Sequence, residues 1–443
     1  MLFILLKMFC ICQLFKRASN EIIMIIFNKE LGSARDNLKA PVHNWFKFTA
    51  GFSYQFVDEI IEKEKLEKGI SKVYEPFAGC GTTLVQSQKS GISALGNEGQ
   101  EFMYNIINAK LNWNIDEATF IDGLSQIKKR IVSNIKFDNT KIHDLLKSLY
   151  SENNLQQIYQ IRETIATFEK KESYLFFYIA LSQTLHKVSI HPIASPYISR
   201  NKTLSNTLSA LTVFEKIAKA MFEDTRKIVD YPKTSNIFLH DSRFENTHIS
   251  SESCDTCITS PPYLNNLDYG EVSKVHSHFF NITDSWNDIT KNVRQNLVTA
   301  ATTHYKDAEF NIEKFKETEF YQVNTLICEE LLAAAAEIKE TAKQRKGKKS
   351  FDILALYYFN DMYLVLKEMK RVLKPNSRAY LILGDSAPYG FFIPTTEYLG
   401  KIAMNLDFKS FEIHKIRTRG TKWSTLKNRH HLELSENVLI LSK

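Results

Sequence analysis

Cysteine, proline and glycine are scarce in this sequence, with 6, 10 and 15 occurrences among 443 residues. This scarcity excludes a disulfide-stapled scaffold, a collagen-like repeat and a low-complexity chain. The cysteines are scattered along the chain, which favours a reduced, cytoplasmic protein. The length, in contrast, is sufficient for two or three domains with full hydrophobic cores.

Apolar runs long enough to span a membrane are also lacking near the start of the chain. Two strongly apolar runs, at 1–15 and 21–27, are separated by a Lys-Arg pair, and both are shorter than the roughly 18–20 residues of a membrane helix. A signal peptide carries its basic residues ahead of the apolar run, whereas here they follow it. We therefore expect no membrane partner and interpret residues 1–40 as an N-terminal extension, with translation hypothetically starting at Met24.

The charge balance is moderately basic, with 57 Lys and Arg against 50 Asp and Glu and a formal net charge of +7. This balance permits a polyanionic partner without requiring one. Basic clusters occur at 343–349 and 416–431, and a Pro-punctuated polar segment occurs at 191–202. Runs of charged residues usually form solvent-exposed faces. We therefore infer phosphate contacts at these segments only if other features indicate that the protein binds nucleic acid.

Metal-binding motifs are missing as well. Cys254 and Cys257 form one CxxC with no second pair and no histidines at ligand spacing, so buried strand residues are favoured over a zinc or redox site. For the pair His430 and His431, a position in a solvated loop is a better interpretation than a metal or phosphate contact. We expect no metal.

Strands and helices alternate around a glycine-rich turn at 79–81. The pattern predicts a helix at 54–68, then a strand at 73–75, a helix at 82–89 and a strand at 92–97. Further short strand-like runs, each ending in polar residues, are expected at 236–242 and 254–263. A strand is also expected at 379–383, after a Lys374–Asn376 turn, and a last one at the end of the chain. This alternation predicts a doubly wound α/β sheet of the Rossmann-like type with mainly helical insertions.

The expected organisation follows from these elements. After the extension at 1–40, we expect a first part of the sheet domain at 41–110, a helical insertion at 111–235, a second part of the sheet domain at 236–284, a second helical insertion at 285–350 and a C-terminal part at 351–443.

The motif EPFAGCGTT, at 75–83, carries the first chemical signal. Gly79 and Gly81 allow a ligand to approach the backbone closely, and the next helix presents its N-terminus to polar groups. Glu98 ends the following strand, where an acid can bond the hydroxyls of a ribose. The turn lacks both the GxGxxG spacing of a dinucleotide site and the GK[ST] ending of a P-loop, so adenosine without phosphates is the favoured ligand. A purely structural turn is the alternative.

The motif TSPPY, at 259–263, carries the second signal, directly after an expected strand. Two consecutive prolines fix φ, so that the carbonyls of Ser260 and Pro261 project rigidly beside Tyr263. Two acceptors and an aromatic face suit the exocyclic amino group of a flipped base. A plain proline-rich turn is the alternative here.

Together, EPFAGCGTT and TSPPY resemble the motifs of S-adenosylmethionine-dependent DNA amino-methyltransferases, and SPPY is most typical of the cytosine-N4 enzymes. The segment at 44–57, with Phe52 and Ser53 in GFS, looks like the family's N-terminal cofactor segment. Asp241 resembles the acid that contacts the adenine. Glu75 stands where the family more often has Asp. The resemblance covers roughly 200 residues and leaves the insertions out.

The resemblance implies a class I methyltransferase fold, S-adenosyl-L-methionine as cofactor and double-stranded DNA as partner. It makes 41–110 the expected cofactor-binding half, 236–284 the expected catalytic half and the insertion at 111–235 the candidate DNA-recognition region. It also implies a restriction-modification setting, in which a cognate restriction endonuclease is a candidate partner. The expected cofactor-binding residues are Phe52, Ser53, Glu75, Pro76, Phe77, Gly79, Gly81, Thr82, Thr83, Glu98 and Asp241. The expected catalytic residues are Ser260, Pro261, Pro262 and Tyr263.

The predicted reaction is methyl transfer to N4 of a flipped cytosine. The Ser260 and Pro261 carbonyls would orient the amino group and Tyr263 would stack on the base. Adenine N6 is the close alternative because it offers the same amino geometry. More remote alternatives are an RNA base methyltransferase and a catalytically silent nucleic-acid-binding protein.

Overall fold

In the computed structural model, the described residues are 34–48, 50–133, 140–193, 198–204, 208–228, 235–344, 350–419 and 432–443. The hypothetical start at Met24 and the His430–His431 pair lie outside these residues, as do most of the two basic clusters and residues 194–197 of the Pro-punctuated segment. Across the described ranges, no helix combines the length and the apolar character required to cross a membrane.

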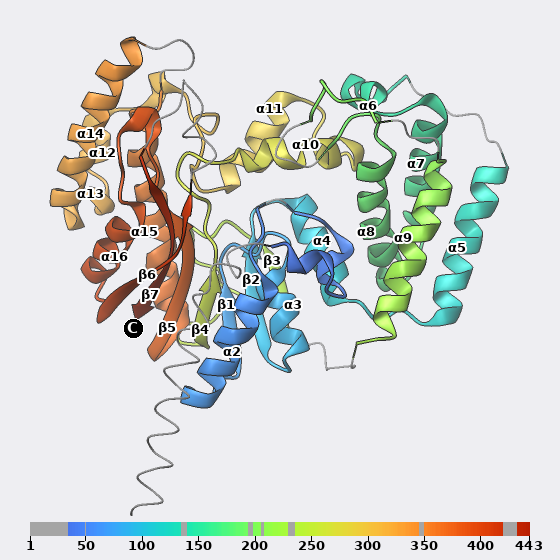
Figure 1. The fold of residues 1–443 in the computed structure, drawn as a ribbon, viewed down its shortest axis with the longest axis horizontal. Helices are drawn as coiled ribbons and strands as arrows, with labels where there is room; N and C mark the ends of the chain where they lie inside the picture. Colours follow the sequence, from blue (N-terminus) through green and yellow to red (C-terminus); the bar gives the residue numbers. More distant parts are fainter. Residues whose placement is uncertain are drawn as a thin grey trace, which may run out of the picture.

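The strands of the described chain form one seven-stranded sheet (Figure 1). Its order is β3-β2-β1-β4-β5-β7-β6. Neighbours from β3 to β5 are parallel, whereas β7 is antiparallel to both β5 and β6. The bounds are β1 Lys72–Glu75, β2 Ser93–Glu98, β3 Asn236–Leu239, β4 Cys254–Thr259, β5 Leu373–Gly384, β6 Ser410–Arg419 and β7 Leu434–Ser442. This order confirms the predicted doubly wound α/β fold of the class I methyltransferase type.

Helices cover both faces of the sheet because successive side chains of a strand point to opposite faces. Val73 packs with α2 (Tyr54–Lys68) and α3 (Thr82–Lys89), while Tyr74 packs with α15 (Leu354–Val372) and α16 (Thr395–Asn405). The strand pattern therefore places one hydrophobic cluster on each side of the sheet. The predicted helices at 54–68 and 82–89 are confirmed with the same bounds.

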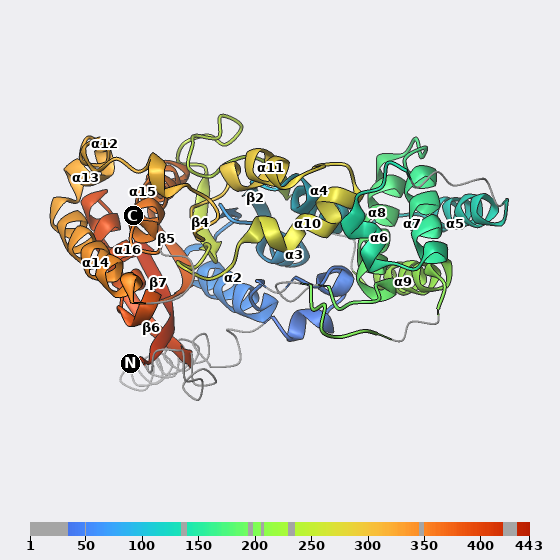
Figure 2. The same cartoon turned by 90° about the horizontal axis from the view of Figure 1, so that it is seen from above.

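The helical lobe of the first insertion lies at one end of the molecule and helices α12 to α14 of the second at the other, while α11 lies between them beside α10 (Figures 1 and 2). After α4 (Glu101–Leu111), the first forms a helical lobe of α5 (Glu117–Val132), α6 (Asp144–Leu149), α7 (Glu152–Ile165), α8 (Lys171–Val188) and α9 (Ala210–Thr225). The second follows α10 (Tyr269–Phe279) and contains α11 (Trp286–Asp288), α12 (Ile312–Lys316), α13 (Glu319–Val323) and α14 (Thr325–Lys343). Both insertions are mainly helical, as predicted.

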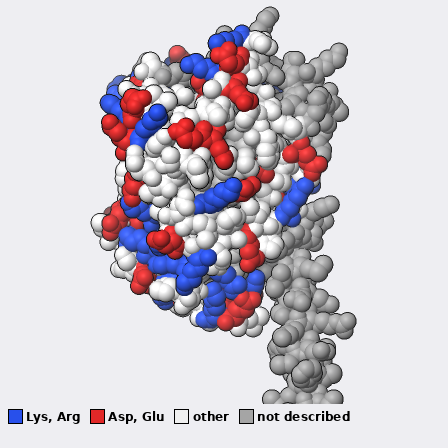
Figure 3. All heavy atoms as spheres, turned by 90° about the vertical axis from the view of Figure 1, so that its left-hand side faces the viewer, with Lys and Arg blue, Asp and Glu red and all other residues white. Residues whose placement is uncertain are grey.

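The side of the molecule where α12 to α16 lie carries charges of both signs (Figures 1 and 3). Figure 3 shows Lys and Arg interspersed with Asp and Glu on this side of the molecule. Several of them are paired, including Lys367 with Glu319 at 2.7 Å and Lys401 with Glu397 at 2.8 Å. Among the described residues of this face, basic side chains thus stand close to acidic ones, which offset part of their charge (Figure 3).

Two features differ from the sequence expectation. The turn predicted at Lys374–Asn376 is wrong, because β5 begins at Leu373 and runs through it. Asn376 has a φ of 63°, and its N–H donates to the Lys443 carbonyl at 3.0 Å, so the end of the chain supports this irregular part of the strand. Strand β6 was not predicted, since its burial pattern is largely exposed and lacks the apolar alternation that identifies a half-buried strand.

Candidate active site

A cavity opens where β1, β2, β3 and β4 end. Parallel strands bring their carboxyl ends to the same edge of a sheet, and ligands of open α/β folds bind outside this edge. The space between the lining atoms of the cavity amounts to about 770 Å³, which includes open solvent at the mouth. Nine of the expected site residues line it, namely Phe52, Pro76, Phe77, Gly79, Thr82, Glu98, Asp241, Ser260 and Pro262.

The glycine-rich turn and Glu98 are joined directly. The Gly79 N–H donates to Oε2 of Glu98 at 2.9 Å, and the Gln100 N–H donates to Oε1 at 2.9 Å. Gly79 and Gly81 have φ values of 55° and 81°, a backbone conformation that favours glycine. Burial raises the pKa of Glu98 to about 7, while these backbone hydrogen bonds lower it. The carboxylate is therefore held in a fixed position at the cavity wall, and its oxygens have lone pairs left for hydroxyl donors.

Glu75 lies beneath the cavity and does not line it. Its Oε2 accepts from the Thr83 hydroxyl at 2.8 Å, and its Oε1 accepts from the Phe77 N–H at 2.9 Å and from the Thr259 hydroxyl. Burial raises the pKa of Glu75 to about 8, although these hydrogen bonds lower it. The contacts tie β1, α3 and β4 together, so this carboxyl group supports the site from below.

Ser53 and Gly81 are also structural neighbours of the cavity. Ser53 is buried and accepts the Gln55 N–H at 3.2 Å, which caps the N-terminus of α2. Gly81 precedes α3, and a Cβ at this position would lie 3.2 Å from the Ile107 side chain. The two residues shape the backbone beside Phe52 and Gly79, which do line the cavity.

Asp241 lines the cavity with both carboxylate oxygens already engaged. Arg243 Nε lies 3.0 and 3.1 Å from the two oxygens, and Arg243 Nη2 lies 2.6 Å from Oδ2. Arg243 also contacts Asp361 on α15 at 3.2 Å. The acid expected to face the adenine is thus one member of a buried ion-pair cluster at the cavity wall.

The TSPPY segment divides between the cavity and the protein interior. The Ser260 hydroxyl donates to the Ile382 carbonyl of β5 at 3.1 Å, and the Tyr358 hydroxyl donates to the Pro262 carbonyl at 2.9 Å. Pro261 is buried and does not line the cavity, although its neighbours on both sides do. These contacts hold the loop rigidly between β4, β5 and α15.

The Tyr263 side chain is engaged by the β6–β7 pair. Its hydroxyl donates to Oε1 of Glu436 at 3.1 Å, and the Arg419 guanidinium lies 4.9 Å from the ring centre. Burial, with the nearby Glu436 carboxylate, raises the pKa of Tyr263 well above its usual value. Tyr263 is not among the residues that line the cavity, whereas Tyr269 is.

Sequence reasoning missed several residues of the cavity wall. Gln100 and Met103 come from the start of α4, and Tyr269 comes from the start of α10. The least expected contribution is Asn296, Leu297 and Val298, from the second insertion. The position of Gln100 two residues after Glu98 is a usable signal, but nothing in the local sequence at 296–298 identifies a binding residue.

Cys254 and Cys257 are buried in β4, as predicted for strand residues. Burial raises the pKa of Cys254 to about 11, which disfavours the thiolate that a metal requires. Within the part of the chain that the structure describes, no group of three or more His, Cys, Asp or Glu side chains has an arrangement suited to a metal ion.

Comparison with known proteins finds relatives at low sequence identity over most of the chain. The chain is 23% identical to the type II methyltransferase M.BsoBI of Geobacillus stearothermophilus, an alignment covering 89% of this chain and 84% of that protein. Its relatives are type II methyltransferases. M.MvaI of Kocuria varians is 21% identical, with 88% and 86% covered, and M.AvaI of Nostoc sp. is 25% identical, with 86% and 82% covered. No family model matches the chain. The similarity to these methyltransferases includes the insertions, because it extends over most of both chains.

Proposed function

We propose that this protein transfers a methyl group from S-adenosyl-L-methionine to an exocyclic amino group of a base in double-stranded DNA, with N4 of cytosine as the preferred target. The observation that carries the proposal is that the EPFAGCGTT turn, Glu98 and the TSPPY loop converge on a single cavity. The type II methyltransferase relatives support the same class of reaction. A restriction-modification role with a cognate endonuclease belongs to this proposal.

The residues of the cavity fit the proposed cofactor. Glu98 offers an oriented carboxylate to ribose hydroxyls, and Gly79 leaves the adjoining backbone without a side chain. Phe52 and Phe77 provide apolar surface on the same wall. When bound, the cofactor supplies an electrophilic methyl group. Glu75 and Thr83 support this wall from below, and Asp241 is proposed to contact the adenine through a carboxylate oriented by Arg243.

The protein's own part in the reaction is to position the amino group and exclude water. The amino group of a base is inaccessible to a bulky donor within the duplex, so the target base is proposed to flip into the cavity. The carbonyl oxygen of Ser260, a residue that lines the cavity, orients the amino group and stabilises positive charge as it forms. Pro261 is buried behind the wall and is proposed to present its carbonyl when the base enters. Their loop is rigid because Ser260 and Pro262 are bonded to β5 and α15.

An aromatic partner for the base completes the proposed site. Tyr263 is proposed to stack on the base because of its position in the TSPPY motif. Tyr269 is a second candidate because it lines the cavity. The helical lobe α5–α9 is the proposed DNA-recognition region. Adenine N6 is the alternative target, since its amino group has the same geometry.

Nucleoside analysis tests this proposal. The chain would be expressed in a host free of DNA methylation, and its DNA would be hydrolysed and analysed by mass spectrometry. We expect N4-methylcytosine, absent from a Pro262→Ala control of matched expression and melting temperature. N6-methyladenine would keep the mechanism and change the base, while unmodified DNA from a folded, cofactor-binding protein would contradict the proposed substrate.

A further inference from the structure

A short segment of the second insertion forms part of the cavity wall. We call residues Arg294–Thr299 the strap. Asn296, Leu297 and Val298 of the strap line the cavity together with Glu98 and Asp241. The strap lies directly against the backbone that follows Glu98, because a Cβ placed on Gly99 would be 2.4 Å from the Asn296 carbonyl oxygen. Only glycine therefore permits this close approach.

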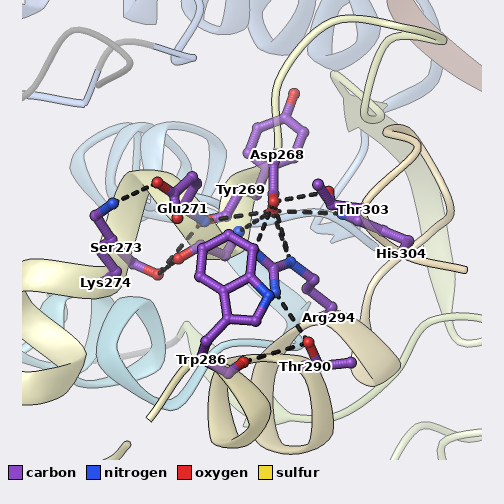
Figure 4. A network of polar contacts seen from close by, with 11 residues as sticks. Asp268, Tyr269, Glu271, Ser273, Lys274, Trp286, Thr290, Arg294, Thr303 and His304 are labelled. Atoms are coloured by element: carbon purple, nitrogen blue, oxygen red, sulfur yellow. Dashed lines mark hydrogen bonds and ion pairs between the residues drawn. The ribbon is translucent and has the colours of Figure 1, made fainter. Parts of the chain in front are cut away.

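The first residue of the strap is fixed to the loop that carries TSPPY (Figure 4). Arg294 Nε lies 3.0 Å and Nη2 2.8 Å from Oδ2 of Asp268, and the two side chains are only 0% and 5% exposed. The Thr303 hydroxyl donates to the same oxygen at 2.7 Å. Asp268 ends the loop after Tyr263 and caps α10, whose first residue is the cavity residue Tyr269. The ion pair thus joins the strap to the proposed base-binding loop.

The outer side of this ion pair is covered by one aromatic ring. Trp286 of α11 lies over the Arg294 guanidinium at 4.1 Å, and the ring is itself 54% exposed. His304 lies on another side, with Nε2 3.6 Å from Oδ1 of Asp268. Figure 4 shows these side chains gathered around the carboxylate of Asp268. Burial raises the pKa of Asp268, but contacts with the His304, Arg294 and Thr303 side chains outweigh it. They hold this pKa well below its usual range, so the carboxylate is charged at neutral pH.

The rest of the strap is fixed to the cofactor side of the cavity. Arg243, which holds Asp241, also donates to the Gln295 carbonyl. The Thr299 N–H donates to Oδ2 of Asp361 at 2.9 Å, the same oxygen that Arg243 contacts. One arginine therefore connects the strap to the acid proposed to contact the adenine, and the other connects it to the loop proposed to hold the base.

We infer that the strap couples the two halves of the active site, with Arg294 and Asp268 as positioning residues that set the TSPPY loop relative to the bound cofactor. The inference rests on the proposed function and goes beyond it, because it assigns a role to a segment that neither motif contains. Neither residue touches the reacting atoms. Loss of either charge leaves the other one buried without its partner, which displaces the strap and the start of α10 together.

The test compares Arg294→Gln and Arg294→Lys with the wild-type chain. The affinity for S-adenosylhomocysteine is measured by calorimetry, and KM and kcat are measured by methyl transfer from labelled cofactor to unmethylated bacterial DNA. We expect Arg294→Gln to weaken cofactor affinity at least tenfold and to lower kcat as well, because both halves lose their alignment. Arg294→Lys should recover part of both losses. Lys367→Gln removes an exposed ion pair at 2.7 Å and should change neither quantity.

A second variant keeps the inference falsifiable if Arg294→Gln does not fold. Trp286→Ala removes an exposed ring and leaves the ion pair intact, and we expect a twofold to fivefold loss in kcat/KM. If Arg294→Gln folds and keeps the wild-type cofactor affinity and kcat, the inference is overturned and the proposed function stands. If Arg294→Gln does not fold, a wild-type kcat/KM in Trp286→Ala overturns the inference in the same way. A wild-type chain that binds no S-adenosylhomocysteine would overturn both.

Discussion

The backbone N–H of Gly79 donates to the carboxylate of Glu98 across 2.9 Å, which joins the loop after β1 to the end of β2. A side-chain acid is thereby oriented by the turn that the proposed cofactor must approach. The acid is 6% exposed, and its position is determined by its hydrogen bonds to the backbone N–H groups of Gly79 and Gln100. Binding to such an arrangement requires little rearrangement of the free protein.

Replacing Glu98 should separate cofactor binding from folding. Glu98→Ala removes the proposed ribose acceptors, and we expect the dissociation constant for S-adenosylhomocysteine to rise by tenfold or more, since hydrogen bonds to charged groups contribute about 1.5–3 kcal/mol. Calorimetry on the folded variant measures this effect. An unchanged dissociation constant would refute the assignment of Glu98 to the cofactor.

Glu75 should make the stability of the protein depend on pH. Its pKa is about 8 in the folded chain against 4.5 ordinarily, so its contribution to stability is fully present below pH 4.5 and is lost as the pH rises through about 8. Glu75→Gln cannot ionise and keeps an acceptor for the Phe77 N–H. We expect the wild-type melting temperature to fall between pH 6 and pH 9, and to fall less in the variant. Parallel melting curves for the two proteins would show that Glu75 does not titrate in this range.

The two aromatic candidates for base stacking can be told apart. Tyr263→Phe removes the hydrogen bond to Glu436 and should cost about 1–3 kcal/mol of stability, with turnover largely kept. If Tyr263 stacks on the base, Tyr263→Ala should abolish methyl transfer while sparing the affinity for S-adenosylhomocysteine. If Tyr269 does so instead, Tyr269→Ala should have the larger effect. Single-turnover rates measured on unmethylated DNA decide between them.

Gly99 provides a test of the close contact with the strap. Gly99→Ala places a methyl group 2.4 Å from the Asn296 carbonyl oxygen, so the strap must shift and cofactor affinity should fall at least fivefold.

Gly69→Ala is the matched control for this substitution. Gly69 caps α2 with a φ of 63° and has no atom within 4 Å of the added Cβ, so the change should cost roughly 1–2 kcal/mol of stability without altering cofactor affinity. Equal affinity losses in the two variants would point to general destabilisation and against the strap contact.

Local sequence was sufficient for the elements that carry the two motifs. The apolar spacing at 54–68 and the strand, turn and helix around Gly79 depend on contacts between near neighbours, and these elements appear with nearly the predicted bounds. The exposed strand β6 could not be recognised in this way, because it has little apolar alternation of its own. Its position depends on pairing with β7.

The sequence by itself determined that the chain forms a doubly wound α/β sheet and that the residues at the ends of four of its parallel strands meet at one edge. Periodicity specifies the elements, and the right-handed crossover of parallel strands brings their ends together. Only the tertiary structure decided that Glu75 supports the cavity from below, that Tyr263 is engaged by Arg419 and Glu436, and that residues 296–298 complete the wall. These relationships join residues far apart in the chain, and buried charges choose their partners only when packing brings them within hydrogen-bonding distance.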